Sequence, residues 1–245
     1  AGIKAQGPQK YVALRALAAL WDQSDPDQVE RAVVFATEAS STSPAAAVYG
    51  QILLAEARSR RGDATGAAAR MAALGFIDRW LFVGPFDDQN RVGLAAAYQP
   101  ETELSQAIVP GRVYDGKERP VRWRAQSPNV GGVIFDFGDW LRPRDQICGY
   151  VTSIVRAKDG TRAPRPISLW VGAEGAFKLW FNGQLLLEDG AYRGFDFDRF
   201  SARAQLLPGQ NRITVKVCGD VRSPQLAVRI GDERGAPDLG VEVSN

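Results

Sequence analysis

The sequence contains no histidine, and this absence excludes more functions than any motif in the chain indicates. Ser-His-Asp and Cys-His nucleophile systems need an imidazole as their base, and many zinc sites use imidazole ligands. The two cysteines, Cys148 and Cys218, are too few for a cysteine-rich metal site. We therefore expect no catalytic constellation of these classes and predict that this chain is not an enzyme.

Long apolar runs and an excess of one charge are also missing. No apolar run reaches the roughly 20 residues that a transmembrane helix needs, so the sequence predicts no transmembrane segment. The 30 basic and 28 acidic residues give a net charge of +2, which argues against a nucleic-acid partner. The 245 residues are enough for two modest domains, each with a core of its own.

The two cysteines each lie in a predicted strand, Cys148 in 147–157 and Cys218 in 211–219. Because cysteine packs as a small apolar residue, we favour two buried thiols over a disulfide. Export to an oxidising compartment would instead favour the disulfide.

The first 75 residues show the periodicity of amphipathic helices. Asp25 and Ser43 each stand before a proline, in the position of a helix N-cap, and Gly62 stands where a helix would end. The pattern predicts helices over residues 8–21, 24–40, 43–63 and 64–74.

One helical pair carries a resemblance to a known family. The stretch YGQILLAEARSRRGDATGAAARMAAL, residues 49–74, has a turn at Gly62-Asp63, followed by a small residue at Ala67 and a bulky one at Met71. It resembles one tetratricopeptide repeat. Since an array needs about three repeats to be stable alone, the resemblance implies helical hairpins that pack on a neighbour.

From residue 76 onward, short β-rich runs alternate with Gly, Pro and Asp. This texture is typical of an all-β sandwich or barrel. The predicted strands are 79–86, 131–137, 147–157, 167–173, 176–183, 184–189, 200–206, 211–219 and 225–231, and residues 239–245 read as a strand edge. We expect the longer connections between 87 and 130 to cross one edge of the sandwich.

The order of three motifs carries a second resemblance. They are WLFVGPFD (80–87), VGAEGAFKLWFNGQLL (171–186) and LLPGQNRITVKV (206–217). Together they resemble the bacterial galactose-binding-like jelly rolls, which are β-sandwiches similar to carbohydrate-binding modules. The resemblance implies an α+β multidomain chain, with tetratricopeptide-like helical hairpins over residues 1–75 and an antiparallel jelly-roll β-sandwich over 76–245. The chain departs from the family at 173–175, where relatives often have an Asp-rich turn.

Residues 168–190 predict three antiparallel strands, joined by a loop at 173–175 and by a type I′ turn at Asn182-Gly183. Alternation places one set of apolar side chains in the core. The opposite face carries Trp170, Lys178, Trp180, Leu185 and Leu187. An apolar face of this kind has to be covered, and the candidates are the N-terminal helices, a partner protein and a saccharide. We favour the helices.

The predicted ligand-binding residues fall in two places. Those on the apolar face are Trp170, Lys178 and Trp180, and those in the segment 187–200 are Tyr192, Arg193 and Asp196. The jelly-roll resemblance places the second group at the binding end of the sandwich, where an aromatic ring and a bidentate arginine suit a hydroxyl-rich ligand.

Asp87, Asp88 and Asn90 bring three oxygen-bearing side chains together just after a predicted strand. An ordinary polar turn explains them, and a structural calcium ion is the alternative. Apart from this calcium, the sequence predicts no cofactor.

The resemblance to the bacterial jelly rolls implies a non-catalytic binding or assembly region of a larger bacterial protein, exported to the periplasm or the cell surface. Its partner would be another protein, further domains of the same chain, or a polysaccharide. One alternative is a carbohydrate-binding module that uses Trp170, Trp180 and the 192–200 loop. Another is the accessory N-terminal region of a transglutaminase-like or protease-like enzyme whose catalytic part follows residue 245.

Overall fold

A computed structural model describes the chain except for residues 1–7, 20–24, 39–42, 127–131, 161 and 245. The chain divides into two compact units. The helical unit comprises residues 1–76 and 229–239, and the β unit comprises residues 77–228 and 240–245. The sequence prediction placed residues 229–239 in the β-sandwich, whereas here they belong to the helical unit. No helix in the described parts of the chain is long and apolar enough to cross a membrane.

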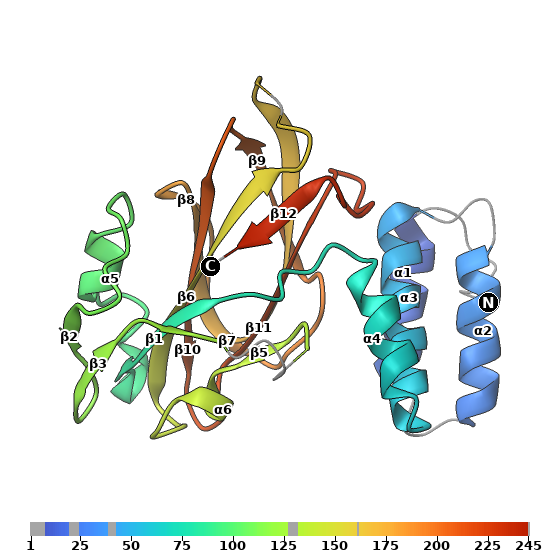
Figure 1. The fold of residues 1–245 in the computed structure, drawn as a ribbon. Helices are drawn as coiled ribbons and strands as arrows, with labels where there is room; N and C mark the ends of the chain where they lie inside the picture. The colour runs from blue at the N-terminus through green and yellow to red at the C-terminus, as the bar shows by residue number, and fades with distance from the viewer. Residues whose placement is uncertain (1–7, 20–24, 39–42, 127–131, 161, 245) are drawn as a thin grey trace. The chain divides into compact units, whose positions relative to one another are not determined.

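The helical unit contains α1 (Pro8–Ala19), α2 (Pro26–Glu38), α3 (Pro44–Arg60) and α4 (Ala64–Ala72) (Figure 1). Capping fixes where α3 and α4 begin, because Ser43 accepts the Ala46 N–H at 3.3 Å and Asp63 accepts the Gly66 N–H at 2.8 Å. Gly62, at a φ of 85°, makes the turn between them. The predicted helices are confirmed within the described residues, and their predicted ends at 20–21, 24 and 39–40 lie outside that part of the chain. The tetratricopeptide resemblance stays a prediction.

Residues 229–239 join the helical unit through backbone hydrogen bonds. The Ile230 N–H donates to the Gly75 carbonyl at 2.9 Å, and the Ala45 N–H donates to the Arg234 carbonyl at 3.0 Å. A segment from the far end of the chain therefore holds the start of α3 and the residues that follow α4.

The β unit is mostly antiparallel sheet. Its strand order is β4-β1-β6-β10-β7-β11-β5, with β12 paired to β6 and with β8 and β9 paired to β7. The strands are β1 (Leu81–Asp87), β4 (Arg124–Ala125), β5 (Phe135–Asp136), β6 (Ile147–Ala157), β7 (Arg165–Phe181), β8 (Gln184–Arg193), β9 (Phe200–Leu206), β10 (Asn211–Gly219), β11 (Gln225–Gly231) and β12 (Val241–Ser244). A two-stranded sheet of β2 (Val113–Asp115) and β3 (Pro120–Arg122), and the short helices α5 (Gln99–Thr102) and α6 (Phe137–Trp140), complete the unit.

β7 is one continuous strand, so the predicted hairpin at 173–175 is wrong. Its first half pairs with β9, where Leu169 lies opposite Ala202, and its second half pairs with β10 and β8. Gly175, between the halves, has a φ of 95° and passes so close to the Cys218 carbonyl that a Cβ would overlap it. The backbone freedom of glycine lets the chain continue as a strand where the sequence suggests a turn.

The second predicted turn of this region is confirmed. Asn182 and Gly183 have φ values of 52° and 81°, and Phe181 pairs with Gln184 across the β7–β8 hairpin. The Asn182 carbonyl oxygen Oδ1 also accepts the Arg212 N–H at 2.8 Å, which ties the turn to the start of β10. Asn182 therefore has a structural role.

The predicted core face of β7 is confirmed, because Leu169, Val171, Phe177 and Leu179 are all buried. The opposite face of its second half is covered by residues 88–125, which we call the covering connection. Trp180 is 5% exposed and packs in one cluster with Leu94, Tyr114 and Trp123 of that connection. The cover thus comes from the β unit itself and not from the N-terminal helices that we favoured.

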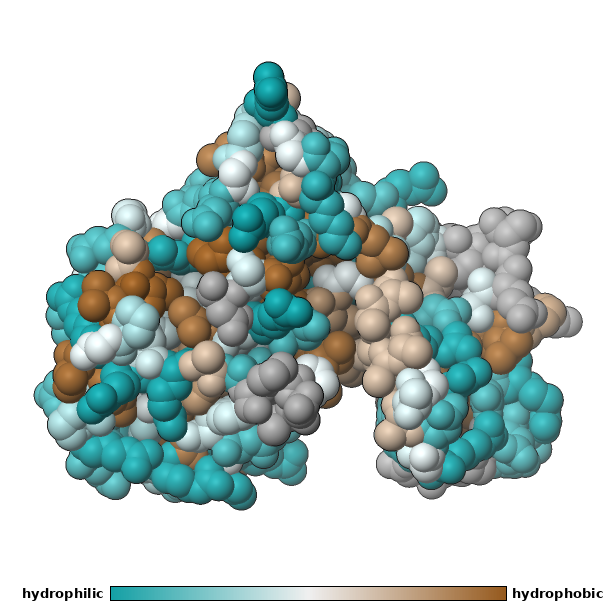
Figure 2. Space-filling model, in the orientation of Figure 1, coloured by the Kyte–Doolittle hydropathy of each residue, from teal (hydrophilic) through white to brown (hydrophobic). Residues whose placement is uncertain are grey.

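The covering connection also differs from its predicted course, because it spreads over a face of the sheet and does not run along an edge. Figure 1 shows α5, β2 and β3 as a layer of their own beside β1 and β10. On the face that Figure 2 shows, apolar residues are interspersed with hydrophilic ones over this layer. Val109 and Val113 are among its exposed apolar residues.

The two cysteines form a disulfide, which corrects the favoured prediction of free thiols. β6 and β10 are adjacent antiparallel strands, and their register places Cys148 directly opposite Cys218. The pairing of two strands that are not consecutive in sequence therefore decides the state of both residues.

Candidate binding groove

A groove of about 220 Å³ opens where β8 and β10 end, beside the middle of β7. We call it the end groove. Side chains reach it from the loop after β1, from β7, from the end of β8 and from the loop after β10. Its lining residues are Arg91, Glu174, Gly175, Tyr192, Arg193, Gly194, Gly219, Asp220, Val221 and Arg222.

Tyr192 is held in one position by contacts at its hydroxyl group and on its ring. The hydroxyl donates to Oδ2 of Asp88 at 2.7 Å, and the guanidinium of Arg91 lies 4.8 Å from the centre of the ring. Arg91 in turn donates to Oδ2 of Asp220, from Nε at 3.0 Å and from Nη2 at 2.7 Å. The groove therefore presents an aromatic ring whose orientation does not depend on a ligand.

Asp88 holds the Tyr192 hydroxyl from the buried side of the groove. It is fully buried, and its Oδ1 accepts the Gly93 N–H at 2.9 Å while Oδ2 accepts the Tyr192 hydroxyl. Burial raises the pKa of Asp88, and the two hydrogen bonds oppose that rise. Burial and the neighbouring carboxyl group raise the pKa of Tyr192, so its hydroxyl remains a donor at neutral pH.

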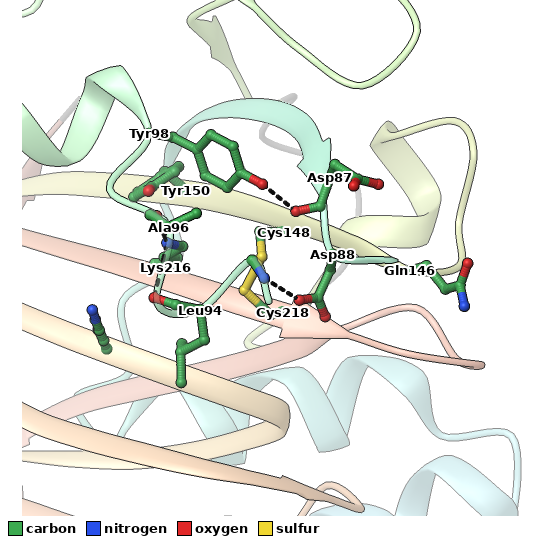
Figure 3. The surroundings of a disulfide bond; sticks show 12 residues. Asp87, Asp88, Leu94, Ala96, Tyr98, Gln146, Cys148, Tyr150, Lys216 and Cys218 are labelled. Atoms are coloured by element: carbon green, nitrogen blue, oxygen red, sulfur yellow. Dashed lines mark hydrogen bonds between the residues drawn. A yellow bond between two sulfur atoms is a disulfide. The ribbon is translucent and has the colours of Figure 1, made fainter. Parts of the chain in front are cut away.

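The disulfide lies next to Asp88, at the base of the loop that carries Arg91 (Figure 3). Gly93 passes so close that a Cβ would stand 2.6 Å from Sγ of Cys148 and 2.7 Å from Oδ1 of Asp88. Any larger residue would push this loop away from the strands. Asp88 and both sulfur atoms lie within 4.8 Å of one another, but sulfurs bonded to each other do not act as thiolate ligands.

The residues predicted to hold calcium have protein partners. Asp87 lies 3.2 Å from Nζ of Lys117, and both carboxyl oxygens of Asp88 accept hydrogen bonds. Asn90 has a φ of 58° in the short 3-10 turn Gln89–Arg91. These contacts suit a polar turn, and the calcium site stays a prediction.

The structure brings two of the predicted ligand-binding residues, Tyr192 and Arg193, into the end groove. Asp196 lies outside its lining and pairs with Arg199 at 3.4 Å. Trp170 is half-buried on β7, opposite Ser201 of β9.

Lys178 and Trp180 are engaged beneath the covering connection, so neither forms the predicted ligand platform. Nζ of Lys178 lies 3.3 Å from Glu101, and the indole of Trp180 is buried in the cluster described above. The cavity left between this connection and the sheet measures about 20 Å³, which is room for a single water molecule. A saccharide cannot stack there.

A buried ionic cluster fastens the covering connection to the sheet. Lys216 is fully buried and donates to Oε2 of Glu101 at 3.1 Å and to the Ala96 carbonyl at 2.6 Å (Figure 3 shows its contacts with Leu94 and Ala96). The Tyr150 hydroxyl donates to the same Glu101 oxygen at 3.0 Å. Burial lowers the pKa of Lys216, and the carboxylate opposes this change.

The sequence reasoning missed four charged residues of the end groove: Arg91, Glu174, Asp220 and Arg222. Glu174 belongs to the segment where the chain departs from the galactose-binding-like pattern, and Asp220 and Arg222 directly follow a predicted strand. Their positions in the sequence could have marked these three residues as candidates for a site. Arg91 gave no such signal, because its role depends on a contact with Asp220, which is 129 residues away.

No family model matches the chain, and no curated protein matches it. Among solved structures, it is similar to a PA14 sugar-binding domain from an RTX adhesin, with 15% identity, a TM-score of 0.32, and coverage of 40% of this chain and 51% of the other. An anti-sigma factor domain-containing protein matches with 14% identity, a TM-score of 0.38, and coverage of 69% and 46%. A family 35 carbohydrate binding module from Clostridium thermocellum matches with 14% identity, a TM-score of 0.27, and coverage of 38% and 75%.

The chain thus spans about half the length of the first two matching structures. All of these TM-scores lie below 0.5, so the matches carry no argument about function, and the resemblance to galactose-binding-like domains stays a prediction.

Proposed function

We propose that the β unit is a non-catalytic binding module and that the end groove is its ligand site, with a saccharide as the ligand. The observation that carries this proposal is the fixed ring of Tyr192 in an open groove whose walls hold arginine and carboxylate side chains. An aromatic ring packs against the apolar face of a sugar, and planar charged groups bind pairs of hydroxyl groups.

The contacts within the groove favour binding over catalysis. Asp220 is ion-paired with Arg91, and Glu174 lies 3.8 Å from Nη1 of Arg222. The chain also has no histidine that would act as a base. The lining therefore suits recognition of a polar ligand.

The proposal is tested by titrating the purified protein with a panel of neutral and acidic oligosaccharides in a calorimeter. Tyr192→Ala should abolish binding because it removes the stacking surface. Tyr192→Phe keeps the ring and loses only the hydrogen bond to Asp88, so we expect it to retain most of the affinity. Trp170→Ala serves as a matched control outside the groove. If Trp170→Ala abolishes binding and Tyr192→Ala does not, the end groove is not the site.

The sequence resemblances and the disulfide support a further proposal about the setting of this module. We propose that it is a galactose-binding-like sandwich preceded by tetratricopeptide-like helices, within a longer exported protein. The disulfide between Cys148 and Cys218 supports export, because such bonds persist mainly in oxidising compartments. A signal peptide encoded upstream, and periplasmic or surface location of the tagged full-length protein, would test this setting.

A second candidate function is the docking of another protein on the helical unit. Phe35 of α2 is 60% exposed, and it lines a hollow of about 360 Å³ together with Val34, Arg61 and neighbouring residues of α2. Exposed apolar side chains beside charged ones are typical of protein interfaces. A photo-crosslinking residue at position 35 should then capture one specific protein in cells, whereas the same residue at Ser59, an exposed position of α3 outside the hollow, serves as the control.

A further inference from the structure

We infer that the saccharide bound in the end groove is acidic and that Arg193 and Arg222 bind its anionic group. The inference rests on the proposed function and names the ligand class more narrowly. It follows from the way in which three arginines and two carboxylates share the lining of the groove.

The first arginine is already engaged within the protein. Arg91 directs Nε and Nη2 to one oxygen of Asp220 and lies over the ring of Tyr192. It has a φ of 61°, a left-handed conformation that residues with a side chain seldom adopt. Arg91 is thus held between Asp220, which balances its charge, and the ring of Tyr192.

The other two arginines have N–H donors that are not used by the residues the structure describes. Arg193 donates Nε to Oδ2 of Asp189 at 2.9 Å, and its terminal nitrogens bind no acceptor in the described part of the chain. Nη1 of Arg222 stands 3.8 Å from Glu174, which is beyond hydrogen-bonding distance. The side chains of Arg193 and Arg222 are 51% and 80% exposed. Each therefore presents a guanidinium fork to solvent at the same groove.

The backbone leaves space in front of these forks. Arg193 pairs in register with Gly175 of β7, and Gly194 and Gly219 also line the groove without side chains. Two guanidinium groups beside one hollow repel each other, and an anion between them relieves that repulsion. A carboxylate suits this position because it accepts bidentate hydrogen bonds from arginine.

Two further features match a saccharide that carries such a group. At about 220 Å³ the groove is smaller than the 300–1,000 Å³ typical of sites for drug-sized ligands, so it encloses about one sugar ring. Glu174 can then accept hydrogen bonds from hydroxyl groups of the sugar, and the ring of Tyr192 can pack against its apolar face. The groove therefore fits one uronate residue of a longer chain.

The test compares two oligosaccharides that differ in one group. One ends in glucuronate and the other ends in glucose, and a sulfated analogue forms a third arm. We expect the glucuronate form to bind about tenfold to a hundredfold more tightly than the glucose form, which is the usual worth of charge-assisted hydrogen bonds. Arg193→Gln combined with Arg222→Gln should remove this preference, and Arg193→Lys should remove part of it. Arg162→Gln, an exposed arginine outside the groove lining, controls for the loss of positive charge.

Each outcome separates this inference from the proposed function. If both sugars bind equally and Tyr192→Ala abolishes both, the end groove is the site and the inference about acidity is wrong. If the preference persists in the double arginine variant, Arg193 and Arg222 do not bind the anion. A ligand that must be sulfated to bind replaces the carboxylate with another anion at the same arginines and overturns the assignment to uronates. If no saccharide binds, the proposed function fails and this inference fails with it.

Discussion

Breaking the disulfide should destabilise the β unit and loosen the end groove together. Cys148 and Cys218 are 70 residues apart in sequence and directly opposite each other on β6 and β10. Two residues beyond them, the Gln146 N–H donates to the Asp220 carbonyl at 2.6 Å, and Asp220 is the partner of Arg91 in the groove. The covalent bond therefore lies at the base of the site.

The size of the effect follows from the length of the closed loop. For a loop of about 70 residues, the chain-entropy model gives about 4 kcal/mol of stabilisation, within the usual range of 2–5 kcal/mol for native disulfides. A Cys148→Ala/Cys218→Ala variant also removes two buried sulfur atoms and leaves a small cavity. Reduction of the wild-type protein breaks the bond and leaves no cavity, so it isolates the contribution of the cross-link.

The assay is guanidinium unfolding of the oxidised protein, the reduced protein and the alanine variant. Tryptophan fluorescence reports mainly on the β unit, which holds five of the six tryptophans. We expect reduction to lower the unfolding free energy by about 4 kcal/mol, and the alanine variant to lose slightly more. Saccharide binding should weaken in both. Equal midpoints for the oxidised and reduced proteins would refute the argument from loop entropy.

Two further predictions concern buried acids. Glu101→Gln should lower the free energy of unfolding by about 3 kcal/mol, because Lys216 keeps a buried charge without its partner. Trp180 should then become accessible to quenching by acrylamide. Glu188→Gln, at an exposed residue, is the control and should change neither the stability nor the quenching. Asp88 has a pKa raised by burial, so stability should fall as the pH rises above its ordinary value of 3.8. Asp88→Asn should flatten that part of the pH–stability curve, measured by thermal unfolding at a series of pH values, and an unchanged slope would contradict the assignment.

The sequence was sufficient where local patterns decide the structure. The strands 147–157, 200–206, 211–219 and 225–231 have the predicted bounds, because each is an alternating or apolar run between turn residues. The buried face of β7 was also correct although its hairpin was not. A three-residue loop and a continuous strand both keep odd-numbered residues on one side, so Leu169 and Leu179 face the core either way.

Features that depend on contacts distant in sequence were out of reach. The disulfide requires β6 and β10 to be neighbours in a particular register, and strand propensity contains no information about either. The cover of Trp180 comes from residues 88–125, where regular elements are only two to four residues long and give little periodicity. The end groove joins Arg91 to Asp220 across 129 residues for the same reason.

The motifs behind the galactose-binding-like resemblance have structural roles in this chain. Asn182 closes a turn, and Asn211 is buried and donates to the Leu207 carbonyl at 2.8 Å. Lys216 anchors the covering connection through Glu101. Substituting these three residues would therefore test folding and say little about the ligand.

The residues of the end groove lie mostly outside those motifs. Arg91, Tyr192, Arg193 and Arg222 come from strand ends and loops, where substitution changes the lining of the groove and leaves the core intact. The motifs therefore describe the architecture, and under the proposed function these loops would select the ligand. For this reason the comparison of Tyr192→Ala with Tyr192→Phe, in a protein whose core is unchanged, separates binding from folding.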